Sequence, residues 1–369
     1  MGRVTADELT AERFEGRAAL EALEPEWREL VAASGVDPLC NGFTFVRAYA
    51  RGWLDESGPG APFGWVLRDR DGRAQALLPF RREPARGPLA LGRARLLVDG
   101  TFDSDYLDLP TRPGAERAAV ECAIELLRRE RGLQALVLAS VPADSTVLEC
   151  WRQVAAERRL PTRERPDACA VSDLAPTFEE QLGRLPKRMR SKVRQARRRA
   201  EEAGATASWC DDTGRLDEHL ETLFELHALR WQSVGEAGSF AQAPRRRYYG
   251  ELAHGLAAEG SLRLARLDHE GRAICLQIGA LIDGTYYQLQ EGYDPAVDAF
   301  RPGIALRGWA LEQLIGQGAR RYDFMGGDSR HKRDWNAEPR DCRTLALALP
   351  RWRGRLAYGL RAAVDRLRG

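Results

Sequence analysis

The segment 262–335 constrains the fold more than any other part of the chain. Its alternating apolar residues predict two turn-linked strands, 262–268 and 273–282, and a third strand at 285–292. Arg301-Pro302-Gly303 then opens a helix expected over 303–316, and a strand follows at 320–325. Proline suits the first helical turn, and glycine lets a backbone come close to a ligand. Because amides at a helix start point outward unpaired, this order of elements predicts an anion-binding turn.

Composition places the chain among folded globular proteins. Its 369 residues suffice for two domains, with 44% hydrophobic and 30% charged residues. The N-terminus is not typical of a signal peptide, and no apolar run is long enough to cross a bilayer, so we expect a cytoplasmic protein. Seven scattered cysteines, never spaced C-x-x-C, and five histidines without a ligand-like pair favour reduced thiols and no metal site.

Periodicity predicts alternating helices and strands along the whole chain. In the first half, helices are expected at 18–33, 43–54, 114–131 and 144–157, and strands at 63–69, 74–81, 93–98, 105–109, 134–140 and 168–173. Before the segment 262–335, helices are expected at 177–203, 216–232 and 244–259. After it, a strand is expected at 343–349 and a basic amphipathic helix at 352–367.

The two halves share an order of elements. The turn at 70–76 resembles the turn at 269–275, and each hairpin leads to one more strand, a helix and another strand. We interpret this as a duplication of an α/β unit with a mixed sheet, with units at 1–165 and 166–369. Chance similarity of a common turn is the alternative.

Several pieces of the sequence together resemble a known family. They are Arg245–Tyr249, Tyr286–Pro295, Pro302-Gly303, Tyr322–Asp328 and His331-Lys332, with weaker matches at Lys187–Lys192 and Asp103–Leu109. This combination resembles the GNAT-type acyltransferases that include the CelD-like proteins of cellulose biosynthesis, which are related to the Fem-type aminoacyl transferases. The resemblance implies two GNAT-like units facing a cleft, the first on the acceptor side and the second binding the donor.

The resemblance also implies direct transfer of an acyl group from acyl-CoA, as co-substrate, to an amine of a small metabolite, a sugar or a cell-surface precursor. Two positions depart from the family pattern, because Arg301 stands where many relatives have Ser and His331 where many have Tyr. A single Pro-Gly replaces the glycine-rich phosphate loop of simple GNAT enzymes. These departures bear on whether acyl-CoA is the donor.

Candidate site residues fall into three groups. For the donor, the pyrophosphate is expected on the turn 302–304, with these residues in contact: Gln290, Arg301, Pro302, Gly303, Ile304 and Arg307. Exposed amides of 288–292 are candidates to stabilise an oxyanion, Glu291 to relay a proton and Tyr293 to protonate the leaving group. A turn-capping or packing role is the alternative for the last two side chains.

The remaining candidates rest on the resemblance. Lys332 corresponds to a late lysine that lies beside the reacting carbonyl in Fem-type relatives, which implies a charge-stabilising role. Asp105 and Tyr106 match a region that holds the acceptor, and further substrate contacts are expected from Arg247, Tyr249 and Asp328. A solvated cation, a strand-edge aspartate and packed aromatic rings are the structural alternatives.

The segment 187–199 carries eight basic groups in thirteen residues. Such a helix is typical of a solvated surface, and it also suits phosphate contact with CoA, tRNA, nucleic acid or an anionic membrane. Two rival functions therefore stay open. One replaces acyl-CoA by aminoacyl-tRNA as donor, and the other is a non-catalytic GNAT-like binding protein in polysaccharide or natural-product biosynthesis.

Overall fold

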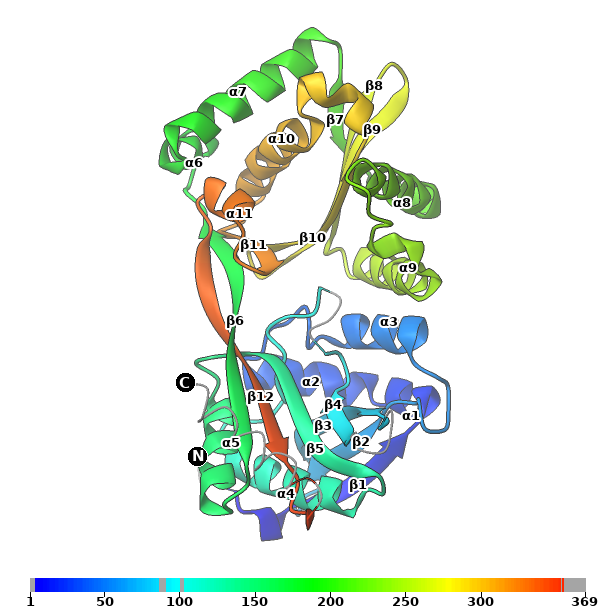
Figure 1. The fold of residues 1–369 in the computed structure, drawn as a ribbon, viewed down its shortest axis with the longest axis vertical. Helices are drawn as coiled ribbons and strands as arrows, with labels where there is room; N and C mark the ends of the chain where they lie inside the picture. Colours follow the sequence, from blue (N-terminus) through cyan, green and yellow to red (C-terminus); the bar gives the residue numbers. More distant parts are fainter. Residues whose placement is uncertain (1–3, 86–90, 100–102, 353, 355–369) are drawn as a thin grey trace. The chain divides into compact units, whose positions relative to one another are not determined.

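The computed structural model describes residues 4–85, 91–99, 103–352 and 354, which form two compact units. The first unit comprises the chain up to Ala168 together with the residues from Asp341 onward. The second unit is the intervening chain, Cys169–Arg340. Each unit packs helices on a mixed sheet (Figure 1), so the predicted tandem α/β architecture is confirmed.

In the first unit the strands follow the order β1-β2-β3-β4-β5-β12. The pairs β1–β2, β2–β3, β3–β4 and β5–β12 are antiparallel, whereas β4 and β5 are parallel. The strands are β1 (Thr10–Glu15), β2 (Phe63–Arg68), β3 (Ala74–Glu83), β4 (Gly92–Leu96), β5 (Leu133–Pro142) and β12 (Glu338–Ala348). The helices are η1 (Ala6–Glu8), α1 (Arg17–Ala22), α2 (Glu24–Ser34), α3 (Phe43–Trp53), α4 (Glu116–Arg129) and α5 (Thr146–Glu157).

Three predictions for this part of the chain need correction or fall outside it. The residues 105–109 are not a strand, because Tyr106 adopts a left-handed backbone (φ 56°) that no regular strand accommodates. The late strand was expected in the second unit, but β12 pairs with β5 of the first, for example Ala346 with Val137. The second unit therefore ends at Arg340 and not at the C-terminus. Most of the predicted helix 352–367 lies outside the described residues.

In the second unit the strand order is β6-β11-β10-β9-β8-β7. The pair β10–β11 is parallel, and the pairs β6–β11, β9–β10, β8–β9 and β7–β8 are antiparallel. The strands are β6 (Thr162–Asp173, of which Cys169–Asp173 belongs here), β7 (Thr206–Trp209), β8 (Leu262–His269), β9 (Arg272–Ile282), β10 (Thr285–Tyr293) and β11 (Arg321–Gly326). The helices are α6 (Phe178–Arg184), α7 (Lys187–Glu202), η2 (Thr213–Arg215), α8 (Leu216–Gln232), η3 (Ser239–Ala241), α9 (Ala243–Ala258), η4 (Pro295–Phe300), α10 (Pro302–Gly316) and α11 (Arg330–Asp334).

Helices cover both faces of this second sheet (Figure 1). Helices α8 and α9 pack on one face, and α10 packs on the other with α7 lying across it. Helices α7 and α10 come close at Gly308 of α10, where an added Cβ would lie 2.9 Å from Cγ1 of Val193 on α7. The helix predicted over 177–203 is in fact two helices, because Pro186 cannot continue α6 and instead precedes α7.

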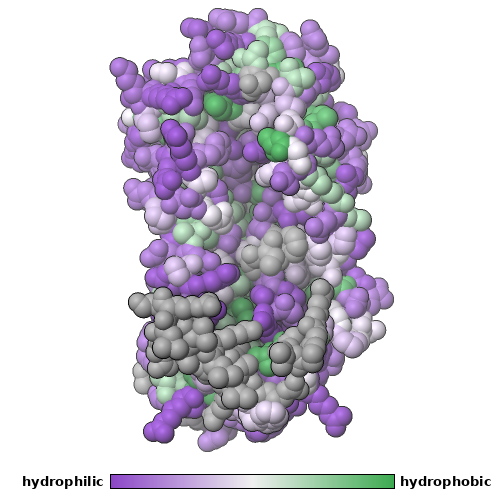
Figure 2. Space-filling model, in the orientation of Figure 1, coloured by the Kyte–Doolittle hydropathy of each residue, from purple (hydrophilic) through white to green (hydrophobic). Residues whose placement is uncertain are grey.

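The surface is mainly hydrophilic on the face shown in Figure 2. Within the described residues, no helix combines the length and the apolar character that crossing a membrane requires.

Candidate functional site

Two neighbouring strands of the second unit part halfway along their length. Strands β10 and β11 pair from Thr285↔Arg321 to Tyr287↔Asp323, and within the described residues no pairing continues beyond. The rest of β10 stays paired with β9, up to Tyr293↔Cys275. A strand that loses one neighbour exposes a row of backbone N–H and C=O groups. The gap is therefore a place where a ligand can pair with the backbone.

The direction of the β10 amides follows from the register. The amide of Asp294 donates to Ile274 O of β9 at 2.9 Å. Because backbone N–H groups alternate along a paired strand, the amides of Glu291 and Tyr293 point away from β9. The carbonyl of Glu291 also points away, and accepts from Arg230 Nη1 at 3.5 Å. Two amides thus face the side where β11 has left.

Local features of both strands explain why they part. In β11 the carboxylate of Asp323 accepts the amide of Met325 at 2.7 Å, and Met325 has a left-handed φ of 58°. The pairing of β11 with β6 shifts register between Asp323 and Gly326. In β10 the register with β9 shifts between Gln288 and Gln290, which marks a bulge. Bulges re-aim a strand, so the sheet cannot stay closed here.

The start of α10 lies directly on the end of β10. A Cβ added to Gly303 would lie 2.8 Å from Glu291 Oε1 and 3.7 Å from Tyr293 Cδ1. Arg301 caps the helix in a left-handed conformation, φ 50°. Its carbonyl accepts the amides of both Ile304 and Ala305, so the helix starts tightly.

The turn 302–304 consequently offers fewer free amides to an anion than the sequence indicated. Proline at position 302 has no amide, and the amide of Ile304 is used by Arg301. Among the described residues, the Gly303 amide has no hydrogen-bond partner in the helix or outside it. Ile304 packs against two apolar clusters of the unit and is half-buried. One free amide and the positive end of the helix dipole remain for a ligand.

Arg307 does not lie where the sequence suggested. It was expected to add charge at the pyrophosphate, but it is 3% exposed and its Nη2 donates to Glu291 Oε2 at 2.8 Å. Glu291 is itself 8% exposed. Burial of one ion without the other is costly, so Arg307 and Glu291 are expected to stay paired. Neither is free to meet solvent-borne substrate as a base or a phosphate ligand.

The buried pair extends to His331. Nη1 of Arg307 lies 2.6 Å from Nε2 of His331. A guanidinium only donates, so this Nε2 accepts and the ring proton is on Nδ1. The residue as a whole is exposed, but desolvation of its ring and the Arg307 charge lower the pKa of His331 to about 4. His331 is therefore neutral at pH 7, with an N–H as its outer polar group.

Lys332 is held at the end of β11. Its Nζ donates to Met325 O at 2.9 Å and to Gly326 O at 2.5 Å. The lysine thereby holds two successive carbonyls at the bend of β11. Asp328 is exposed and accepts from Arg333 Nη1 at 3.2 Å.

The opposite face of β10 is closed by α8. A Cβ on Gly292 would meet the backbone of α8, at 2.5 Å from His227 N. His227 is 2% exposed, and its Nε2 accepts from Trp231 Nε1 at 2.9 Å. Burial, with the charge of Arg230 nearby, lowers its pKa to about 4. Arg230 stacks over the Tyr293 ring, 5.3 Å from its centroid.

His227, Arg230 and Arg199 were missed by the sequence prediction. Arg199 is exposed and donates to Ala299 O at 3.4 Å, just before the start of α10. The first two lie on α8 in the pattern H-x-x-R, which places them on one helix face. That spacing is a usable signal, but nothing local indicates which strand the face contacts.

Two expected substrate contacts have no exposed surface. Tyr249 is 0% exposed and packs between Phe240 and Tyr248. Tyr106 is also 0% exposed, and its carbonyl accepts from Asn41. Such side chains can support a site only through packing. Asp105 is half-buried and accepts from Ser140 Oγ at 2.8 Å, and Arg247 is exposed on α9.

No group of three or more His, Cys, Asp or Glu side chains is arranged to hold a metal ion in the described part of the chain. Every cysteine is free of disulfide bonds.

The stability of the chain is expected to fall as the pH drops from about 6.5 to about 4, because His227 binds a proton only after unfolding in this range. The buried His227 contributes on the order of 2–3 kcal/mol to this loss. Urea unfolding at pH 7 and pH 4.5 measures it. His227→Gln, which keeps an acceptor for Trp231, should reduce the difference between the two pH values. An unchanged difference would contradict the assignment.

Comparisons with known proteins agree with this geometry. Residues 187–333 match the model of the acetyltransferase (GNAT) domain. No curated protein matches the chain. The residues matched include α10, both parting strands and Lys332. The match confirms the expected resemblance to GNAT-type acyltransferases and supports acyltransferase activity.

Solved structures resemble the whole chain. They include FemX (TM-score 0.59, 15% identity, 87% of this chain and 95% of that one) and a tandem GNAT protein from the clavulanic acid biosynthesis pathway (0.51, 15%, 93% and 99%). A third is the C-terminal domain of a putative lysylphosphatidylglycerol synthetase from Agrobacterium fabrum (0.54, 12%, 92% and 95%). At these identities the similarity shows a shared fold.

Proposed function

The chain carries the acetyltransferase domain of the GNAT family, and we propose that it moves an acyl group from acyl-CoA to an amine. The parting of β10 and β11 carries this proposal. A linear amide-containing donor arm can pair with the free edge of β10. The acceptor is then a small metabolite, a sugar or a cell-surface precursor, and the reaction takes place in the cytoplasm.

The proposed chemistry is direct attack of the neutral amine on the donor carbonyl. The outward amides of Glu291 and Tyr293 supply hydrogen bonds to the oxyanion that forms. The Tyr293 hydroxyl protonates the leaving thiolate, and its oxygen takes up the proton that the attacking amine loses. The diphosphate of the donor rests on the Gly303 amide, with Arg301 and Arg199 adding positive charge. The Glu291–Arg307–His331 chain positions β10 under α10.

Acyl-CoA binding is tested directly by thermal unfolding. Acetyl-CoA at 100 times its dissociation constant should stabilise the chain by roughly 2.7 kcal/mol, and CoA alone should also stabilise it. Inorganic diphosphate at equal ionic strength is the control. Absence of a shift with every CoA ester would contradict the proposal.

One observation favours aminoacyl-tRNA as an alternative donor. On α7 the first four cations, Lys187, Arg188, Arg190 and Lys192, form no salt bridge with any described residue, whereas Arg194 and Arg197 do. Unpaired cations gathered in the first turns of a helix suit a polyanion. Ribonuclease treatment separates the two donors, because it abolishes transfer only if tRNA carries the acyl group. If neither donor binds, a non-catalytic binding protein is the remaining function.

Lys332→Ala is expected to lower kcat for transfer by tenfold or more, while the KM for acetyl-CoA stays within about twofold, as for a charge felt mainly in the transition state. Steady-state kinetics with acetyl-CoA as the varied substrate measure both constants. Arg70→Ala, which removes an exposed cation of the first unit, is the control and should leave both unchanged. Equal loss in kcat and in donor affinity would contradict this role for Lys332.

A further inference from the structure

A pocket of the second unit lies beneath α10. Its wall includes Arg307 and Leu311 of α10, Phe324 of β11, Ser172 of β6 and Trp335 just after α11. About 200 Å³ of space lies between the lining atoms, part of it open to solvent. Its inner part holds roughly one water-sized group. The pocket therefore suits a single polar atom of a ligand, with the rest of that ligand at the open side.

Three hydrogen-bonding groups of this pocket have no partner among the described residues. They are Ser172 Oγ, Arg307 Nε and Trp335 Nε1. The three residues are 2%, 3% and 2% exposed. Buried polar atoms are paired in the great majority of cases, and each unpaired one costs about 1–3 kcal/mol. Three unpaired groups on one pocket, two of them obligatory donors, indicate an acceptor that the chain itself does not supply.

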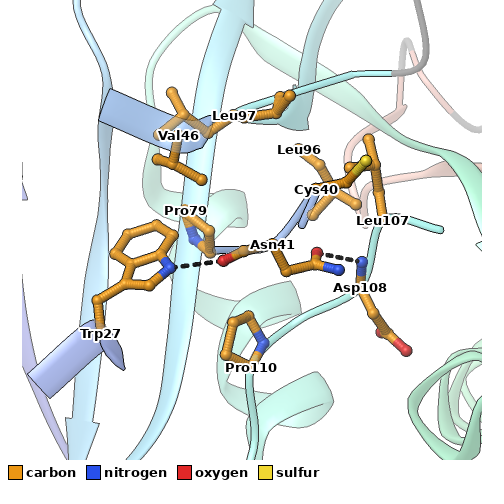
Figure 3. A pocket seen from close by; sticks show the side chains of 11 residues that line it. Trp27, Cys40, Asn41, Val46, Pro79, Leu96, Leu97, Leu107, Asp108 and Pro110 are labelled. Atoms are coloured by element: carbon orange, nitrogen blue, oxygen red, sulfur yellow. Dashed lines mark hydrogen bonds between the residues drawn. The ribbon is translucent and has the colours of Figure 1, made fainter. Parts of the chain in front are cut away.

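A pocket of the first unit provides a contrast, and Figure 3 shows two hydrogen bonds among the residues that line it. There Asn41 Oδ1 accepts from the Asp108 amide at 2.9 Å, and Trp27 Nε1 donates to Asn41 O at 2.8 Å. No buried polar side-chain atom of a residue lining that pocket is unpaired within the described chain. The pocket of the first unit therefore offers no unpaired buried donor, whereas the pocket beneath α10 offers three.

The charges around the pocket beneath α10 limit which ligand its hydrogen-bond donors can bind. The positive charge of Arg307 is already offset by Glu291, 2.8 Å away. Its Nη1 is used by the neutral His331. A second anion would have no counter-charge in this buried setting, and a cation would face the N–H donors of Arg307 and Trp335. We propose that this pocket binds an uncharged acceptor oxygen, the carbonyl oxygen of an amide, ester or ketone. This site does not depend on the acyl-transfer proposal.

Binding is tested on the full chain with ¹⁵N-labelled tryptophan and acetamide as the probe. The indole N–H signal of Trp335 is the one that Trp335→Phe removes. It should move saturably as acetamide is added, and Ser172→Ala should weaken acetamide binding about fivefold, as for one lost hydrogen bond. The indole of Trp151 is the internal control, since its Nε1 is equally buried and unpaired but does not line this pocket.

Four results would overturn the proposal. One is a Trp335 signal that acetamide does not move, and another is a Trp151 signal that moves equally. Acetate binding as tightly as acetamide would refute the argument from charge. A Trp335 N–H bonded to a water that acetamide does not displace would show a permanently hydrated pocket. Loss of acetyl-CoA binding with the acetamide response intact would instead count against the acyl-transfer proposal alone.

Discussion

Replacing Arg307 with methionine is expected to lower the free energy of unfolding by about 3–5 kcal/mol, because it leaves the Glu291 carboxylate buried without its counter-ion. The methionine keeps most of the apolar volume between Phe324 and Trp335, whose rings the guanidinium now contacts. Urea or guanidinium unfolding gives the value.

The matched control is an exposed pair in the same unit. Arg215 lies 2.8 Å from Glu218, and both side chains are more than half exposed. Arg215→Met should therefore change stability by less than about 1 kcal/mol. A double variant with Glu291→Leu and Arg307→Met should recover much of the lost stability, since neither charge remains. Equal effects of the two single arginine variants would show that the Arg307 pair is not effectively buried.

Gly303→Val is expected to weaken acetyl-CoA binding by tenfold or more, about 1.4 kcal/mol. The new Cβ would lie 2.8 Å from Glu291 Oε1, and that carboxylate cannot move away without breaking its bond to Arg307. The start of α10 must then lift from β10, which displaces the one free amide of the turn. Titration calorimetry with acetyl-CoA measures the loss.

Gly316→Val on the same helix is the control for helix propensity, because nothing lies within 4 Å of its Cβ position. It should leave acetyl-CoA affinity unchanged. Weakened binding in both variants would attribute the effect to the helix as a whole. Unchanged binding in Gly303→Val would remove the turn from the donor site.

Local signals predicted most of the second unit. The meander expected at 262–268, 273–282 and 285–292 is found as β8, β9 and β10, and the helix expected at 303–316 is α10. Alternation, turn residues and a Pro-Gly start are properties of neighbouring residues, so they can be read from the chain alone. The parting of β10 and β11 could not be predicted in this way, because it depends on the bulge in β10 and the bend at Met325.

The errors concern which partner a side chain or strand meets. Arg307 follows Ile304 by three residues and precedes Leu311 by four, so it shares their apolar helix face. That position indicates burial with a charged partner, and the sequence analysis did not use this signal when it placed Arg307 at the pyrophosphate. Tyr106 and Tyr249 gave no such signal, because a tyrosine is compatible with either a core or a binding surface. Strand β12 was located correctly in sequence, but its partner β5 is some 200 residues away.

The pairing of β12 with β5 makes the second unit an insertion within the first. The second unit begins at Cys169 and ends at Arg340, and the residues before and after it both belong to the first unit. A truncation after residue 165 would strip a strand from beside β5 and bare a hydrogen-bonding edge prone to self-association. Excision of 169–340, with 168 joined to 341 through a flexible linker, would keep that edge covered. To express the first unit by itself, the second unit must therefore be excised and the ends rejoined, because a simple truncation removes β12.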